Sequence, residues 1–251
     1  MTVAGIVVTH GPSPDLRECL AALSPQVDEL VVVANLPLRL DLPSSAKLIE
    51  NEQPVGFSAN VNRAVRETSA EFVVISNPDT EPSPDAVKIL REYAAARARC
   101  GIAGPQLRYP DGTWQPSRRR FPTVTGTLVR RTPLRYLRRP VEHQTDHYLL
   151  DERPTEPLEA DWMLGAFLLL RREMLDELGG FDEGFRLYGE DIDLAYRAWQ
   201  AGWERWYVPQ AVVRHEHKAE TDKRWLTRRT LWHWRGILRF VRKHPERLLG
   251  R

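Results

Sequence analysis

Three carboxylates follow a glycine within a few residues, at Glu190, Asp191 and Asp193. The apolar and aromatic spacing that continues to Trp203 predicts a helix. Acidic side chains are favoured in a first helical turn because the helix dipole is positive there. An ionised carboxylate at this position can also take a proton from an attacking hydroxyl group. The stretch by itself therefore fits both a solvated helix start and a catalytic base.

A second group of chemical interest is the polar turn that follows the apolar segment 71–76 and contains Asp79. One carboxylate together with diphosphate oxygens and water is a common way of holding Mg²⁺. His215 comes at the end of another apolar segment, 211–214, and an imidazole there can complete a site for Mn²⁺. Turn chemistry and a polar strand end are the alternative interpretations.

The elements that must position these groups alternate between short apolar strands and helices, which predicts an α/β fold with a mostly parallel sheet. We expect strands at 4–10, 29–35, 46–51 and 71–80, and helices at 15–25, 56–69 and 83–98. Ligands of such sheets bind beyond the carboxyl ends of the strands. At the ends of the first two strands the chain has Thr9, His10, Gly11 and Asn35, which are also common turn formers.

The second half of the chain is less regular. Residues 104–157 are rich in Pro, Gly and Arg and predict a long loop, a kind of segment that is often functional. Beyond it we expect a strand at 160–170, a short helix that ends before Gly179, and two short strands around Pro209. The segment 223–249 predicts a basic and aromatic helix.

The composition is that of an ordinary globular protein, with 251 residues of which 42% are hydrophobic and 28% charged. Cys19 and Cys100 are far apart and fit neither a disulfide framework nor a zinc site, which favours the reducing cytoplasm. The first residues resemble a buried strand more than a signal peptide. The longest apolar run, 162–170, has 9 residues, whereas a membrane-spanning helix needs about 20.

The net charge of +2 conceals a strong asymmetry. Residues 223–251 hold ten Lys and Arg and one acid, a charge of +9, so the other residues carry −7. Basic residues are interleaved there with Trp and Leu, a pattern that suits a helix lying on an anionic membrane surface. The apolar stripe would also suit packing on the protein's own domain, or on a second subunit in a homodimer. No nucleic-acid-binding motif accompanies the charge, and we expect no nucleic-acid partner.

Several segments, taken in their order, resemble one enzyme family. They include "GIVVTHGPSPDLRECLAAL", "VGFSANVNRAV", "VVISNPDTEPSPDAV", "GGFDEGFRLYGEDIDLAYRAWQAGW" and "YVPQAVVRHEH". This set resembles the inverting nucleotide-sugar glycosyltransferases of glycosyltransferase family 2, which have the GT-A (Rossmann-like) fold. The segment "DGTWQPSRRRFP" is most similar to the bacterial rhamnosyltransferase branch, which uses dTDP-rhamnose. We therefore expect a GT-A domain at 1–217 and a basic helical tail at 218–251.

The family pattern implies a role for each candidate residue. Asp191 would be the general base, with Glu190 beside it. Asp79, the last position of a DXD-like motif, would bind Mg²⁺ or Mn²⁺ on the sugar diphosphate together with His215. The remaining positions are implied to bind the nucleotide, at Thr9, His10, Gly11, Asn35 and Asn62, and the acceptor or the donor sugar, at Trp162, Gly165, Ala166 and Arg119.

The implied protein is a cytoplasmic, metal-dependent glycosyltransferase for cell-envelope polysaccharide synthesis, peripheral on the inner face of the cell membrane. It would move rhamnose from a nucleotide-diphosphate sugar to a glycan or a lipid-linked acceptor. A sugar nucleotidyltransferase is an alternative, but it would need a Gly-rich, basic phosphate loop where the chain has "THGPSPD". A non-catalytic nucleotide-sugar-binding partner protein is a third interpretation, which the presence of Asp79, Glu190, Asp191 and His215 disfavours.

Overall fold

The computed structural model describes residues 1–11, 13–37, 41–122, 149, 152–216 and 228–246. Its strands are β1 (Val3–Thr9), β2 (Glu29–Ala34), β3 (Ala46–Glu50), β4 (Phe72–Ser76), β5 (Thr80–Pro82), β6 (Cys100–Arg108), β7 (Trp114–Gln115), β8 (Arg118–Arg119), β9 (Leu158–Glu159), β10 (Trp162–Met163), β11 (Phe167–Arg171) and β12 (Glu204–His215). The central sheet has the order β3-β2-β1-β4-β11-β6-β12-β5, with β7 beside β6 and β9 beside β12. β10 and β8 pair separately.

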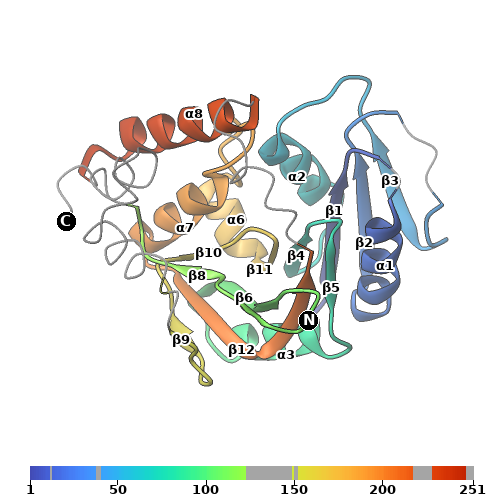
Figure 1. The fold of residues 1–251 in the computed structure, drawn as a ribbon, viewed down its shortest axis with the longest axis horizontal. Coiled ribbons are helices and arrows are strands. Elements are labelled where there is room, and N and C mark those ends of the chain that lie inside the picture. Colours follow the sequence, from blue (N-terminus) through green and yellow to red (C-terminus); the bar gives the residue numbers. More distant parts are fainter. Residues whose placement is uncertain (12, 38–40, 123–148, 150–151, 217–227, 247–251) are drawn as a thin grey trace.

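The helices lie in layers on the two faces of this sheet (Figure 1). They are α1 (Pro14–Leu23), α2 (Phe57–Arg66), α3 (Ala86–Ala95), α6 (Arg172–Leu178), α7 (Glu190–Gln200) and α8 (Arg228–Lys243), with a 3₁₀ turn at Ser24–Gln26. Apolar residues of α1 and α3 pack against one face of the sheet, and those of α2, α6 and α7 pack against the other. α8 forms a further layer outside α7 (Figure 1).

The prediction of a mostly parallel α/β sheet is confirmed. β1 pairs in parallel with β2 and β4, and β2 pairs in parallel with β3, so the carboxyl ends of these strands meet at one edge. β11 is antiparallel to β4 and places Phe167 opposite Ser76. This register brings the beginning of β11 to the same edge as the end of β4.

Three expectations for the second half of the chain are wrong. β6 extends to Arg108, into the segment expected to be a loop, because its residues are buried between β11 and β12. The segment 160–170 forms two strands, β10 and β11, which belong to different sheets. β12 runs through Pro209 as one strand, because a register shift between Val208 and Val212 removes the need for a donor there. Residues 123–148 and 150–151 of the expected loop lie outside the described residues.

The basic helix expected at 223–249 is confirmed over Arg228–Lys243, and 223–227 and 247–249 lie outside the described residues. The ring of Phe240 is buried and meets Tyr196 of α7 edge-on, with centroids 5.7 Å apart. Gly236 lies so close to the carbonyl of Tyr188 that an added Cβ would overlap it. This side of α8 therefore packs on the protein's own domain. Within the described residues, no helix is both long and apolar enough to cross a membrane.

Two consecutive arginines bind the ends of helices on opposite faces of the sheet. They lie at the edge of the sheet where β4 begins, opposite the edge where it ends. The guanidinium of Arg171 donates to the carbonyls of Ala94, Arg97 and Cys100, around the end of α3, at 2.6–2.9 Å. The guanidinium of Arg172 donates to Val65, Thr68 and Ala70, around the end of α2, at 2.8–3.2 Å. Carbonyls at a helix end lack partners within the helix, so each arginine satisfies several of them at once.

We expect Arg172→Met to lower the free energy of unfolding by about 3 kcal/mol, because it leaves three carbonyls without their charged donor. Arg172→Lys should restore only part of this loss, since an ammonium group cannot span three acceptors in the planar arrangement of a guanidinium. Urea unfolding measures both values. Arg66→Met, at an exposed position on α2, is the control and should change stability by less than about 0.5 kcal/mol. Equal effects of Arg172→Met and Arg66→Met would contradict the anchoring role of Arg172.

Candidate active site

Asp79 lies in a tight turn just beyond the end of β4. The amide of Thr80 donates to the carbonyl of Asn77 at 3.2 Å, and Pro78 supplies the fixed φ angle that suits the second position of such a turn. The buried hydroxyls of Ser76 and Thr80 are 2.7 Å apart and join the two ends of the turn. The turn therefore fixes the backbone of Asp79, whose side chain remains partly exposed.

His215 approaches Asp79 from β12. β12 pairs with β5 so that His215 is opposite Thr80, and Nε2 of the histidine is 3.6 Å from Oδ1 of Asp79. On the other side of the ring, Nδ1 is 2.9 Å from Oε1 of Gln115, an amide oxygen that only accepts hydrogen bonds. In a neutral imidazole, Nδ1 then donates its proton to Gln115, which leaves the lone pair on Nε2, on the side of Asp79.

These groups fit a divalent cation that is shared with a ligand. A carboxylate oxygen and an imidazole nitrogen converge, and a hydrogen bond to the far nitrogen is the usual support of a metal-binding histidine. No group of three or more His, Cys, Asp or Glu side chains suited to a metal occurs in the described part of the chain. Diphosphate oxygens would supply further ligands, as is common for Mg²⁺. Metal binding by Asp79 and His215 stays a prediction.

Gln115 is a residue that the sequence did not single out. It lies in β7, which pairs with β6, and its side chain is buried. Its only signal in the sequence is its place in the segment "DGTWQPS", where nothing distinguishes it from an ordinary loop glutamine. Gln115 reaches His215 because β7 and β12 both pair with β6, although the two strands are far apart in the sequence.

The carboxylate pair opens α7 directly after Gly189, whose φ of 95° is in the left-handed region that favours glycine. Oδ2 of Asp191 accepts from the amide of Gly165 at 3.1 Å, and Oδ1 accepts from the amide of Ile192 at 2.9 Å. A Cβ added at Gly165 would lie 3.3 Å from Cβ of Asp191, so a glycine allows this close approach. Asp191 is therefore fixed in place while its side of the helix remains partly exposed.

The two carboxyl groups of the pair have different surroundings. Burial, together with the charge of Asp191, raises the pKa of Glu190 to about 8. Among the described residues Oε2 of Glu190 has no hydrogen-bond partner, so its neutral form is favoured near pH 7. Burial also raises the pKa of Asp191, but the amides of Gly165 and Ile192 and the charge of Arg119 oppose this rise. Asp191 is therefore the member suited to be an ionised base.

Backbone contacts connect the turn of Asp79 to this pair. The amide of Asn77 donates to the carbonyl of Ala166 at 2.8 Å, one residue from Gly165. Trp162 is opposite Arg119 in the β10–β8 pair, and its indole donates to the carbonyl of Arg120 at 2.8 Å. The structure thus brings one connected set together from the predicted catalytic, metal and acceptor positions: Asp79, His215, Trp162, Gly165, Ala166, Arg119, Glu190 and Asp191.

The residues predicted to bind the nucleotide gather at the ends of β1 and β2. The amide of Asn35 donates to the carbonyl of Thr9 at 2.8 Å, and its side-chain nitrogen is 3.3 Å from Nδ1 of His10. The hydroxyl of Thr9 donates to the carbonyl of Gly11 at 2.8 Å. Asn35 also exchanges two hydrogen bonds with the backbone of Val55, at 2.9 and 3.0 Å. These contacts fix the strand ends, and contact with a nucleotide stays a prediction.

Asn62 has a full set of protein partners. Its amide exchanges two hydrogen bonds with the backbone of Phe181, at 2.8 and 2.9 Å, and donates to Glu183 at 3.0 Å. The side chain therefore ties α2 to the loop that precedes α7. Its predicted contact with the nucleotide is not tested by this arrangement.

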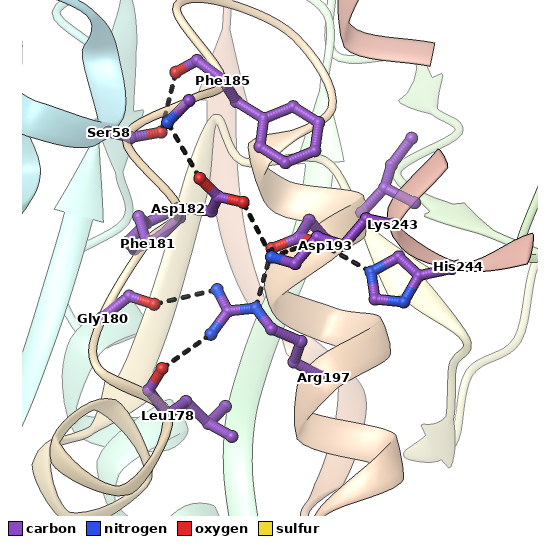
Figure 2. Close-up of polar contacts among 12 residues, drawn as sticks. Ser58, Leu178, Gly180, Phe181, Asp182, Phe185, Asp193, Arg197, Lys243 and His244 are labelled. Atoms are coloured by element: carbon purple, nitrogen blue, oxygen red, sulfur yellow. Dashed lines mark hydrogen bonds and ion pairs between the residues drawn. The ribbon is translucent and has the colours of Figure 1, made fainter. Parts of the chain in front are cut away.

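Asp193, the third acid of the sequence, is fully buried and binds three basic side chains (Figure 2). Its oxygens accept from Nε of Arg197 at 2.7 Å, from Nζ of Lys243 at 3.0 Å and from Nε2 of His244 at 2.9 Å. Burial by itself would raise the pKa of Asp193, but these partners hold it below its ordinary value. Asp193 thus joins α7, the helix of Asp191, to the end of α8.

The arrangement of the sheet and its helices is the GT-A architecture. The protein shares this fold with GalNAc-T7, solved with UDP, GalNAc and Mn²⁺, at a TM-score of 0.63 and 17% identity over 85% of this chain and 43% of that one. A mannosyltransferase from Pyrobaculum calidifontis, solved with GDP-Man and Mn²⁺, is similar at a TM-score of 0.55 and 17% identity, over 98% of this chain and 72% of that one.

The chain belongs to glycosyltransferase family 2, because a family model described as "Glycosyltransferase like family 2" matches residues 41–235. It is 30% identical to the N-acetylglucosaminyl-diphospho-decaprenol L-rhamnosyltransferase of Mycobacterium tuberculosis, over 87% of this chain and 77% of that protein. A shorter match, 35% identical, covers 32% of this chain and 30% of the rhamnosyltransferase WbbL of Escherichia coli K12. The predicted family and enzyme class are therefore confirmed.

We expect Gln115→Met to weaken Mn²⁺ binding about 10–100-fold, because methionine fills a similar volume but cannot fix the proton of His215 on Nδ1. Gln115→Glu keeps an acceptor and should bind Mn²⁺ at least as tightly as the natural protein. Electron paramagnetic resonance of free Mn²⁺, titrated in the presence of thymidine diphosphate, measures both. Unchanged affinity in a folded Gln115→Met variant would disprove the support proposed for His215.

Thermal stability should report the unusual carboxyl group of Glu190. Its pKa is raised from 4.5 to about 8 in the folded protein. Between these two pH values the folded protein keeps a proton on Glu190 that the unfolded chain has released. This contribution to stability is present below the unfolded pKa and is lost as the pH rises through the folded pKa. We therefore expect Glu190→Gln, compared with the natural protein, to gain melting temperature steadily from pH 5 to about 8. A difference that does not change with pH would contradict the raised pKa.

Proposed function

We propose that the protein is a metal-dependent inverting glycosyltransferase with Asp191 as its general base. The observation that carries the proposal is the pair of backbone contacts around Gly165 and Ala166. One holds the carboxylate of Asp191, and the other holds the turn of Asp79. A proton acceptor and a group for the diphosphate are thereby kept at a fixed separation, which direct displacement at a sugar carbon requires.

In this mechanism the acceptor hydroxyl transfers its proton to Asp191 while its oxygen bonds to the anomeric carbon. The bond from that carbon to the diphosphate oxygen breaks in the same displacement, so the configuration inverts through a state with oxocarbenium character. A divalent ion held by Asp79 and His215 would neutralise the charge on the departing nucleoside diphosphate. Neutral Glu190 adds no charge beside Asp191, so it does not oppose the approach of an anionic donor.

For the substrates we propose rhamnose from dTDP-rhamnose as the donor group and a lipid-linked glycan as the acceptor. Similarity to the mycobacterial enzyme, whose name specifies a decaprenol-linked acceptor and L-rhamnose, supports this choice. The charge of Arg119 acts on the pKa of Asp191, and it is the positive charge that a diphosphate-bearing acceptor would need there. Such an acceptor resides in a membrane, so we propose that the protein works in the cytoplasm at the inner membrane face, in cell-envelope polysaccharide synthesis.

The test is turnover of a panel of nucleotide sugars with Mn²⁺ or Mg²⁺, followed by release of nucleoside diphosphate. We expect slow hydrolysis of dTDP-rhamnose that falls about 10²–10⁴-fold in Asp191→Asn, because the variant keeps the shape but loses the base. Asp79→Ala should lose both turnover and metal dependence. Arg66→Met, at an exposed position, is the control. Donor binding without turnover, even after a lipid-linked acceptor is added, would favour a non-catalytic binding protein.

A further inference from the structure

The face of α8 that points away from the domain is strongly basic. A groove of about 520 Å³ lies where this face meets the domain, lined by Asp182, Arg235, Leu238, Arg239, Arg242 and Lys243. Arg235 and Arg242 are exposed and form no ion pair with another described residue. Leu238, between them, is 53% exposed. The groove has four cationic side chains and one acid, so its net charge is positive.

The orientation of this face is fixed by the contacts that α8 makes with the domain. Lys243 and His244 bind the buried carboxylate of Asp193 (Figure 2). Arg239 and Lys243 also bind Asp182, each at 2.8 Å. If α8 rotated about its axis, Asp193 would lose Lys243 and His244 as partners and its charge would be left uncompensated. These contacts therefore hold the helix in its present orientation.

We propose that the outer face of α8 is an electrostatic docking surface for an anionic phospholipid membrane. The packed stripe of the helix includes Phe240, which is 3% exposed and unable to insert into a bilayer. Among the described side chains of α8, Arg235, Arg242 and the apolar Leu238 are exposed and in reach of a partner. Basic side chains held at a surface attract anionic headgroups without insertion, so the docking should depend strongly on salt.

The geometry connects this surface to the site. The guanidinium of Arg186 lies 5.5 Å from the ring of Trp232 in α8, and Gly236 packs against the carbonyl of Tyr188. The segment 185–189 under α8 leads directly into the helix of Asp191. This inference rests on the proposed function for its purpose, since docking would place the site beside a membrane that holds its acceptor.

Vesicle sedimentation tests the proposal in the absence of donor and metal. The full chain should bind vesicles of equimolar phosphatidylglycerol and phosphatidylcholine, and not those of phosphatidylcholine, with affinity that falls as salt rises. The double variant Arg235→Gln/Arg242→Gln should weaken binding about 25-fold, or about fivefold for each charge removed. Arg17→Gln/Lys88→Gln, which removes two exposed charges from α1 and α3 on the other side of the sheet, should bind as the natural protein does.

Three further measurements distinguish electrostatic docking from apolar insertion, from a phosphate pocket and from a nucleic-acid surface. A loss of binding in Leu238→Ser as large as in the double arginine variant, with little effect of salt, would overturn the proposal in favour of apolar insertion. Release by micromolar inorganic diphosphate would show a pocket for free phosphate groups, and tighter binding to RNA than to vesicles would show a nucleic-acid surface. Either result overturns the proposal. Asp191→Asn should bind vesicles normally, so failure of docking is distinguishable from failure of the proposed catalysis.

Discussion

The rest of the site depends on the hydrogen bond from the amide of Gly165 to the carboxylate of Asp191. This bond joins the segment between β10 and β11 to the start of α7. Gly165 lies between β10 and β11, and the register of β11 against β4 sets the adjoining Ala166 beside the turn of Asp79. Asp191 lies at the start of α7, which follows β11 and α6 in the chain. A side chain at position 165 would press on Asp191, so the link requires both the sheet register and a residue without Cβ.

The three acids of α7 show how surroundings, more than residue type, decide the chemistry of a carboxyl group. Glu190 is buried without a hydrogen-bond partner among the described residues, and burial raises its pKa to about 8. Asp191 is held by two amides near the charge of Arg119, which favours an ionised base. Asp193 is buried among basic groups that keep its pKa low. One helical turn therefore carries a group whose neutral form is favoured, a carboxyl group held by backbone amides and a structural anion.

The anion at Asp193 connects the C-terminal helix α8 to the helix that begins with Glu190 and Asp191. Lys243 and His244 reach it from the end of α8, while Arg197 binds it from α7 and also donates to the carbonyls of Leu178 and Gly180. A buried carboxylate with several charged partners tolerates the loss of one poorly, because the remaining charges stay desolvated. Helix α8 is thus packed on the domain that holds the candidate site, while Arg235 and Arg242 are exposed on its outer face.

Much of this protein was determined by the sequence alone. Alternating apolar strands and helices specified the parallel half of the sheet, and the ordered motifs specified the family, because both signals are local in the chain. The missed features are all long-range. β6 and the split of 160–170 follow from strand pairing, and Gln115 meets His215 only because β7 and β12 both flank β6. Whether an acid is base, neutral group or anchor was decided by tertiary structure, since desolvation and partners come from residues distant in sequence.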